Sequence, residues 1–557
     1  MRKFSPSNQV DFVIVGSGAA GGAMAKELSA AGFEVVVLEQ GPRLEDKDFK
    51  HDELKIRNTP ALVNDHALQP NTFRKTDQEK AQLAATISYG RCVGGGTVHY
   101  TGSQWRFHEI DFVERSRWGA IPGTGFADWP ITYAELEPFY VKAEYEFGVS
   151  GTSGASPFDP ARSKPYPLPP MPIKSAGVLF ERGCRKLELH PVAVPSAILS
   201  QPYQGRQACN HCGFCEWYGC ERGAKSSSLA SVIPAAEKTG RCEIRIGSYV
   251  REISVDRSGR VTGVVYFDSR KQEIFQKAKA VVLCANGTES PRLLLLSQSK
   301  LFPGGLANSS GLVGKYLMLG GTASASGIFD EPLNEFKSVM ATRAIEDFYD
   351  SDAKRGFYGG GRIDGRWGFM GPVGYALGGL PPDAPQWGTG YKNFVKENFT
   401  RTMTCQSYLT SLPLETNNIT LDPDVKDAWG LPAMRVTYKE HPDGMKVKQY
   451  FLERSLEILE AAGARKKWAN PARETTSSGH LMGTCRMGND PKTSVVDKFN
   501  RAHDVPNLFI VDGSSFVTSG RNHPTCTIEA LAFRAADNIV KSAKSGSLFQ
   551  RSAAKSV

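Results

Sequence analysis

Apolar residues near the start of the chain fall into two short runs that flank a stretch of small residues. The runs at 13–15 and 35–38 have the continuity of buried strands, and residues 19–31, after a glycine turn, have helical spacing. This order of strand, turn, helix and strand is typical of a parallel nucleotide-binding sheet. We therefore predict that the chain begins with an α/β domain.

Similar apolar segments recur in the middle and near the end of the chain. We predict strands over 243–255, 261–267, 279–283 and 507–511, and helices over 290–297 and 525–543. Segments of one nucleotide-binding domain thus come from three separate parts of the sequence. A second domain must be interleaved with them.

The predicted fold class is α/β (α+β), with a discontinuous Rossmann-like domain and a substrate domain built on an antiparallel sheet backed by helices. We assign residues 1–105, 240–320 and 470–545 to the first domain, and 106–239 and 321–469 to the second. Glycine and proline predict loops at 155–172 and 359–390. The polar residues 546–557 are predicted to form a flexible tail.

Composition and charge narrow the function classes. The chain has 557 residues, enough for two or more hydrophobic cores, and its net charge of +9 comes without a basic stripe, which argues against nucleic-acid binding. No apolar run reaches the length of a transmembrane helix. The start resembles a signal peptide, but cleavage beyond the first apolar run would remove the glycine turn. Export would need a partner subunit; a periplasmic, membrane-associated or cytoplasmic location stays open.

The glycine turn after the first strand has the spacing GxGxxG. Its glycines permit a tight turn and close approach of a pyrophosphate to the following helix, and the acidic residue that ends the second strand can accept hydrogen bonds from ribose hydroxyls. The motif by itself does not separate FAD from NAD. The residues assigned to this nucleotide site are Gly16, Gly18, Ala19, Ala20, Gly21, Glu39 and Gln40.

Four cysteines lie within twelve residues of a predicted insertion at 205–222. Cys209, Cys212 and Cys215 have two-residue spacing, and Cys220 follows after four more residues. Soft thiolate ligands with this spacing favour an Fe–S cluster. A structural zinc site and free or disulfide-forming thiols are the alternatives.

Several of these segments together resemble the glucose-methanol-choline (GMC) oxidoreductases. The resemblance is carried by residues 90–99, by 286–291 and by the histidine region 478–525. It implies a bound FAD, with its pyrophosphate at the glycine turn. Asn286 departs from the glycine usual at that place, and we expect it to change a loop only. The residues that the resemblance adds to the cofactor site are Arg91, Gly95, Thr97, His99, Asn286, Asp512, Gly513, Pro524 and Thr525.

The resemblance also assigns chemistry to three histidines. His480 matches the general base that removes a hydroxyl proton while the flavin N5 accepts hydride, and His523 matches the residue that binds the substrate oxygen. Asn522 is a rival for the second role. His99 matches a position that commonly holds FAD covalently; the alternative is a hydrogen bond to the flavin edge.

Within the family, the chain resembles catalytic subunits of bacterial glucose, gluconate and fructose dehydrogenases and of glucoside 3-dehydrogenases, which carry a cysteine-rich insertion near this point. The cysteine spacing here differs from that of the glucose and gluconate enzymes, so the type of cluster and its ligands stay open. The resemblance to these subunits implies a dehydrogenase that oxidises a sugar or glycoside hydroxyl, with a small companion subunit and a cytochrome c-type acceptor receiving electrons through the Fe–S cluster. The alternatives are an oxidase that produces hydrogen peroxide and a flavoprotein electron carrier without catalytic activity. The sequence does not identify the sugar.

Overall fold

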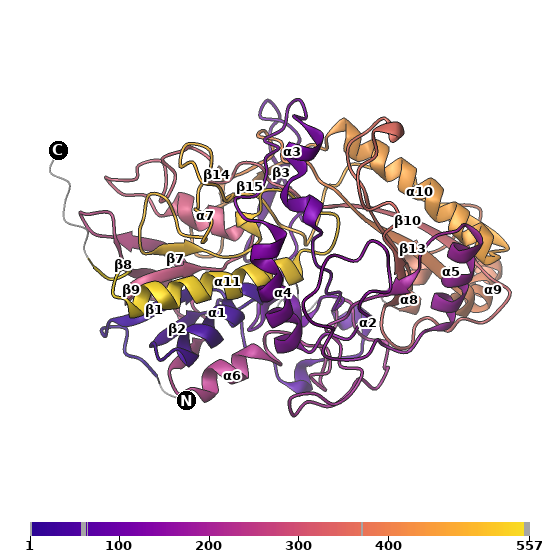
Figure 1. Ribbon diagram of the computed structural model, residues 1–557, viewed down its shortest axis with the longest axis horizontal. Helices are drawn as coiled ribbons and strands as arrows, with labels where there is room; N and C mark the ends of the chain where they lie inside the picture. Colours follow the sequence, from indigo (N-terminus) through magenta and orange to yellow (C-terminus); the bar gives the residue numbers. More distant parts are fainter. Residues whose placement is uncertain (1–2, 57–62, 64, 369–370, 551–557) are drawn as a thin grey trace.

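The computed structural model describes residues 3–56, 63, 65–368 and 371–550. Two large sheets lie at opposite ends of the molecule, each with helices packed on one face (Figure 1). No helix among these residues is long and apolar enough to cross a membrane.

The first sheet has the strand order β6–β2–β1–β9–β8–β7, and β17 pairs with β9. Strands β6, β2, β1, β9 and β17 are parallel, whereas β8 and β7 extend the sheet in antiparallel fashion. Its strands are β1 (Val10–Val15), β2 (Val35–Leu38), β6 (Cys242–Arg245), β7 (Tyr249–Val255), β8 (Val261–Phe267), β9 (Glu273–Leu283) and β17 (Leu508–Ile510).

Both faces of the parallel strands are buried, which explains their continuous apolar runs. Phe12 and Ile14 of β1 face one core, together with α1 (Ala19–Ala30) and α11 (Thr525–Lys544), and Val13 and Val15 face another. In Figure 1 the helices α1 and α11 lie side by side against this sheet. The strands and helices predicted for this domain are confirmed with shifted ends, except that the single strand predicted over 243–255 is two strands, β6 and β7, at opposite edges of the sheet.

The last residues of four parallel strands lie at the same level of the sheet. Val15 is in register with Leu38 and Leu283, and Leu283 is in register with Ile510. The segments that follow these strands therefore begin at one common edge. In open parallel sheets this carboxyl edge is where ligands bind.

The second sheet is antiparallel throughout. Helices α5 (Ser175–Lys186) and α10 (Pro442–Ala462) pack on it through a shared apolar core. This arrangement confirms the predicted antiparallel sheet backed by helices. In spatial order its strands are β16 (Lys466–Ala469), β10 (Gly321–Ile328), β13 (Thr402–Leu409), β12 (Gly361–Arg366), β11 (Ala341–Ile345) and β5 (Val192–Ala193).

A third, smaller sheet joins segments that we had assigned to different domains. Its parallel pair, β3 with β15, links the N-terminal segment to the last third of the chain. A pairing between strands so far apart in sequence leaves no local signal. The strands are β14 (Asn418–Lys426), β15 (Pro432–Thr437), β3 (Asn71–Arg74) and β4 (Gln82–Ala84).

The loop predicted at 359–390 is wrong in part, because this segment contains β12, α8 and the start of α9. Strand β12 is buried along its whole length although it carries Arg362, Asp364 and Arg366. These charged side chains bind partners within the fold, and Ile363 is the only large apolar residue of the strand, so no apolar run reveals it. The loop predicted at 155–172 contains no helix or strand.

The remaining elements connect the sheets. The α-helices are α2 (Glu53–Ile56), α3 (Glu114–Trp118), α4 (Tyr133–Phe147), α6 (Val232–Lys238), α7 (Glu289–Leu296), α8 (Pro372–Gly378) and α9 (Gly388–Asn398). The short 3-10 helices are η1 (Asp46–Asp48), η2 (Gly95–Val98), η3 (Glu109–Phe112), η4 (Ala353–Arg355), η5 (Phe399–Arg401) and η6 (Gly513–Ser515). Of the predicted tail, 551–557 lie outside the described residues, and the preceding Leu548 is buried.

Candidate active site

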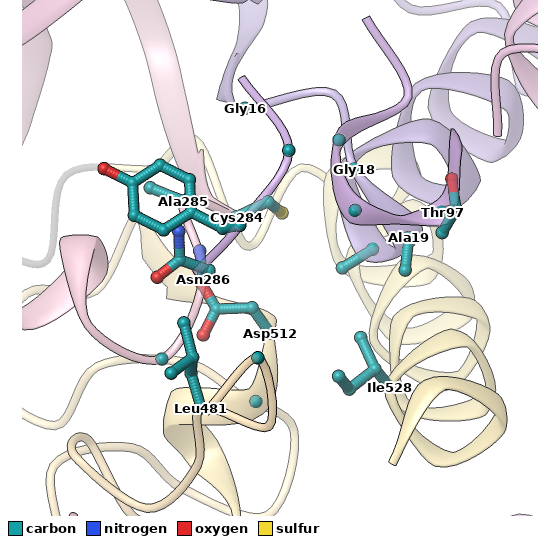
Figure 2. A pocket seen from close by; sticks show the side chains of 18 of the residues that line it. Gly16, Gly18, Ala19, Thr97, Cys284, Ala285, Asn286, Leu481, Asp512 and Ile528 are labelled. Atoms are coloured by element: carbon teal, nitrogen blue, oxygen red, sulfur yellow. The ribbon is translucent and has the colours of Figure 1, made fainter. Parts of the chain in front are cut away.

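A cavity of about 380 Å³ opens at the carboxyl edge of the parallel strands. Segments from the start, middle and end of the chain surround it, as the interleaved domains require (Figure 2). Most of the predicted cofactor residues line it: Gly16, Gly18, Ala19, Ala20, Glu39, Gln40, Gly95, Thr97, His99, Asn286, Asp512, Gly513, Pro524 and Thr525.

The glycine turn between β1 and α1 leaves room for an anion at the helix N-terminus. Gly16 has a φ of +93°, and a Cβ atom at Gly21 would lie 2.0 Å from the carbonyl oxygen of Gly16. Helix α1 then begins at Ala19, beside the open space shown in Figure 2. Unpaired N–H groups at such a terminus bind phosphate. Gly21 does not line the cavity. Its role is to allow the close approach of helix α1 to the backbone of Gly16.

The carboxylate of Glu39 is held at the end of β2. It accepts hydrogen bonds from the Ser17 hydroxyl at 2.6 Å and from the Gly41 N–H at 2.9 Å. Burial raises the pKa of Glu39, an effect that these donors oppose. Nearby, the amide oxygen of Gln40 is buried without a hydrogen-bond partner among the described residues. The two side chains fit the adenosine end of a dinucleotide.

Asn286 and Asp512 face the glycine turn from the opposite side of the cavity (Figure 2). The Asn286 N–H donates to Asp512 at 3.1 Å, and Asn286 has a φ of +85°. Asparagine is among the few residues other than glycine that tolerate this conformation. Its side-chain oxygen accepts hydrogen bonds from Thr288 and Glu289 at the start of α7. This geometry shows how asparagine replaces the usual glycine.

Arg91 does not line the cavity, unlike the other residues that the resemblance added. Its guanidinium lies 5.9 Å from the ring of Trp429, and its Nε is buried without a hydrogen-bond partner among the described residues. Its positive charge lowers the pKa of Glu39, against the larger effect of burial. Arg91 therefore lies beside the site without forming part of the cavity wall.

His99 follows η2, and its imidazole ring lines the cavity. Neither ring nitrogen has a hydrogen-bond partner among the described residues. Burial, helped by the charge of Lys225, lowers the pKa of His99 to about 3. The imidazole is therefore neutral at physiological pH and has a free lone pair. Such an orphaned ring fits a contact or bond to a cofactor.

His480 and His523 come together in the same cavity. Their ring centroids are 5.4 Å apart, and the Tyr408 ring lies 3.9 Å from that of His523. Burial, with a smaller effect from Arg362, lowers the pKa of His480 to about 4 and that of His523 well below 6.5. At Gly320, an added Cβ atom would lie 3.0 Å from Nδ1 of His480, so glycine makes room for this ring.

Asn522 does not line the cavity, although it precedes His523. Its side-chain oxygen accepts a hydrogen bond from Arg362 at 3.0 Å, and its NH₂ group donates to Glu346 at 3.2 Å. The geometry therefore favours His523 over Asn522 as the second polar group that faces the cavity.

The four clustered cysteines do not form a metal site. Within the described part of the chain, no group of three or more His, Cys, Asp or Glu side chains is arranged to hold a metal ion. Cys209 and Cys215 instead belong to a small apolar cluster, and burial raises the pKa of Cys215 to about 12. The Fe–S cluster and zinc predicted from the spacing, with Cys212 and Cys220 as further ligands, are therefore not supported.

The cysteine segment nevertheless contributes to the cavity through the two residues after Cys215. Glu216 and Trp217 line the cavity, and the Trp217 N–H donates to the carbonyl oxygen of His99 at 2.7 Å. Glu216 pairs with Arg366 at 2.7 Å. Neither residue was predicted from the sequence, because the spacing of the neighbouring cysteines indicated a metal site and gave no signal for Glu216 or Trp217.

Arg362 was also missed. It lies on β12 among buried partners, and the alternation of Arg362, Asp364 and Arg366 on one strand face was the available signal. The place of Tyr408 beside the histidines depends on tertiary structure.

Comparisons with known proteins agree with this geometry. Models of the GMC oxidoreductase family match residues 10–319 and 413–532. The chain is 36% identical to 2-methyl-1,2-propanediol dehydrogenase of Mycolicibacterium austroafricanum, covering 96% of this chain and 95% of the relative. It is 31% identical to the fructose dehydrogenase large subunit of Gluconobacter japonicus, with 96% and 98% covered.

Among solved structures, formate oxidase of Aspergillus oryzae RIB40 aligns with a TM-score of 0.67 at 16% identity, covering 98% of this chain and 100% of that one. This likeness supports the fold alone. The family models and the relatives together establish the kinship predicted from the motifs. The chain belongs to the GMC oxidoreductase family.

Proposed function

We propose that this protein is a FAD-dependent dehydrogenase that oxidises a hydroxyl group of a sugar, a glycoside or a related polyol to a carbonyl. The observation that carries this proposal is the convergence of His480 and His523 in a cavity that also contains the glycine turn. Bound FAD would supply the two-electron acceptor for the hydride that leaves the substrate carbon.

The protein's own residues manage the hydroxyl proton. The pKa of His480 is lowered to about 4, so its ring is neutral at physiological pH and can accept that proton. His523 holds the substrate oxygen by a hydrogen bond. The His523 residue is buried, whereas His480 is partly exposed and faces the cavity that substrate would enter. On oxidation of the alcohol, the hydroxyl proton would pass to His480.

The substrate class is inferred from the rest of the cavity wall. Glu216 offers a carboxylate that accepts hydrogen bonds from several hydroxyl groups, and the rings of Trp217 and Tyr408 offer flat apolar surfaces. This combination suits a molecule with neighbouring hydroxyls. Fructose and a 1,2-propanediol, named for two relatives, share that feature. We expect Glu216→Gln to raise KM for polyols more than it lowers kcat.

We propose further that His99 holds FAD covalently. Its unpartnered, neutral ring in the cavity supports this idea. The C–N bond would replace one methyl C–H bond of the flavin and the imidazole N–H, and the two electrons released would pass to the enzyme's electron acceptor. In the purified protein, flavin should stay with the acid-precipitated pellet and be released by His99→Asn. Release of all flavin from the wild type would contradict the tether.

Electrons must leave the reduced protein for an acceptor. We propose a cytochrome c-type acceptor and a small companion subunit, because one relative is named as a large subunit. No step is assigned to the cysteines, since they form no metal group. Analysis of the purified protein for iron, sulfide and zinc tests whether the cysteines bind a metal. Iron and sulfide in stoichiometric amounts would restore the cluster predicted from the spacing.

A substrate screen tests the main proposal. Sugars, glycosides, aldonates and 1,2-diols are added anaerobically to the flavin-loaded protein, and the flavin absorbance is followed. At least one polyol should bleach the flavin, and His480→Ala should slow this reduction by about 10²- to 10⁴-fold while flavin stays bound. His190→Ala, a change at a half-exposed histidine outside the cavity, is the matched control.

The same screen separates the alternatives. Fast oxygen consumption with hydrogen peroxide formation would identify an oxidase instead of a dehydrogenase. Failure of every alcohol and sugar to bleach the flavin would favour a flavoprotein electron carrier. Dye or cytochrome reduction without oxygen consumption supports the dehydrogenase.

A further inference from the structure

We infer that Arg362 is a positioning residue that holds His523 in the tautomer with hydrogen on Nε2, so that His523 donates a hydrogen bond and His480 accepts the substrate proton. The division of roles between the two histidines rests on the proposed function. The tautomer itself rests only on the contacts of Arg362.

The guanidinium of Arg362 is fully buried and held from every side. Its Cζ atom lies 4.3 Å from the Trp105 ring centroid and 5.1 Å from that of Tyr408. Two of its nitrogens bind the carboxylate of Asp364, at 2.8 Å and 3.3 Å. A third nitrogen donates to Asn522 at 3.0 Å. This side chain therefore has little freedom to move or rotate.

The remaining contact joins Nη2 of Arg362 to Nδ1 of His523 at 3.1 Å. A guanidinium stays charged and has only N–H donors, so Nδ1 of His523 must be the acceptor. In a neutral imidazole the other nitrogen, Nε2, then carries the hydrogen. A doubly protonated ring would bring two N–H groups and two positive charges together. His523 is thereby kept neutral, with a single donor available for substrate.

Asn522 supports this arrangement from behind. Its NH₂ group donates to Glu346 and to the carbonyl oxygen of Arg106, at 3.2 Å and 3.3 Å. The amide oxygen must therefore point toward Arg362. Asn522 thus holds the guanidinium of Arg362, which in turn holds His523. Asn522 therefore supports the site although it does not line the cavity.

The two histidines consequently differ although both are neutral at physiological pH. No side-chain hydrogen bond to another described residue occupies the ring of His480, whereas Nδ1 of His523 is occupied by Arg362. A donor at one position and a proton acceptor at the other is the pairing that alcohol oxidation needs. The charged and titratable groups around His523 are Arg362, Asp364, Arg366, Glu346, Tyr408 and His480.

The tautomer can be measured without any substrate. In FAD-loaded protein labelled with ¹⁵N-histidine, the His523 signals are assigned by comparison with His523→Asn. At pH 7, Nδ1 should have the chemical shift of an unprotonated ring nitrogen and Nε2 that of a protonated one. A protonated Nδ1, or exchange between two tautomers, would overturn the proposal even if the protein proves to be an active dehydrogenase.

Kinetics then test the consequence. The double variant Arg362→Gln/Asp364→Asn removes the cation together with its buried carboxylate, so neither charge is left unpaired. We expect kcat for flavin reduction to fall about 10²-fold, as misplaced catalytic groups do, with a smaller change in KM. The His523 signals should also lose their single tautomer. Unchanged kcat with an unchanged tautomer would refute the role of Arg362.

The control is Arg343→Gln on the neighbouring strand β11. Arg343 is partly exposed and pairs with Glu181 at 2.8 Å, away from the histidines. This variant should keep both the kinetics and the tautomer of the wild type. If the double variant does not fold, the spectrum of the wild-type protein still decides the proposal.

Discussion

The pH dependence of flavin reduction is a direct test of the environment found around His480. This histidine must be neutral to accept a proton, so acid inactivates it. Burial, with a contribution from the charge of Arg362, lowers the pKa of His480 to about 4. A histidine exposed to water would instead have a pKa of about 6.5.

These two values predict very different rates in mild acid. At pH 5.5 a base with the pKa of about 4 found for His480 is ~97% unprotonated, whereas one with a pKa of about 6.5 is only ~9% unprotonated. The rate at pH 5.5 should therefore stay close to its value at pH 7.5. An unperturbed histidine would reduce it about tenfold.

The assay is anaerobic stopped-flow reduction of the flavin between pH 4.5 and 8.5 at low substrate concentration. Under this condition the apparent second-order rate constant reports ionisations of the free enzyme. Samples held at pH 5.5 are returned to pH 7.5 and measured again, which separates protonation from unfolding. A fall in the rate constant centred near pH 6.5 would refute the argument that burial lowers the pKa of His480.

Two further changes probe the fold that supports the site. Gly21→Ala should abolish stable flavin binding, because its Cβ atom would lie 2.0 Å from the carbonyl oxygen of Gly16; retention of flavin on a desalting column would contradict this. Asp111→Asn should destabilise the protein by about 3–5 kcal/mol and lower its melting temperature, because Asp111 pairs with Arg521 where both are buried. As a control, Asp537→Asn breaks an exposed ion pair with Lys541 on a helix and should lower the free energy of unfolding by less than about 1 kcal/mol. Equal losses of stability in the two variants would contradict the importance of the buried pair.

Local chemistry made much of the cofactor site predictable. The glycine turn, the strands beside it and the acidic residue Glu39 lie close together in sequence, and their backbone requirements appear directly as residue types. His480 and His523 were found for a similar reason, since each lies in a short recognisable motif. The sequence motif did not show that Asn522 points away from the cavity while the adjacent His523 points into it.

Segments without an apolar pattern were harder to predict. The glycine and proline content of residues 359–390 predicts a loop, whereas the buried strand β12 lies there with Arg362 and Asp364 paired inside the protein. The cysteine spacing suggested a metal site, yet the observed packing of Cys209 and Cys215 is apolar. A spacing pattern gives the order of possible ligands, but side-chain directions decide whether they converge.

The sequence by itself determined the family, the dinucleotide turn and the two histidines, because each depends on a few neighbouring residues. Only the tertiary structure brought Arg362 against His523 and placed Glu216 in the cavity. These contacts join segments that are far apart along the chain. Burial and long-range pairing set which ring nitrogen holds a proton, and a one-dimensional pattern contains neither.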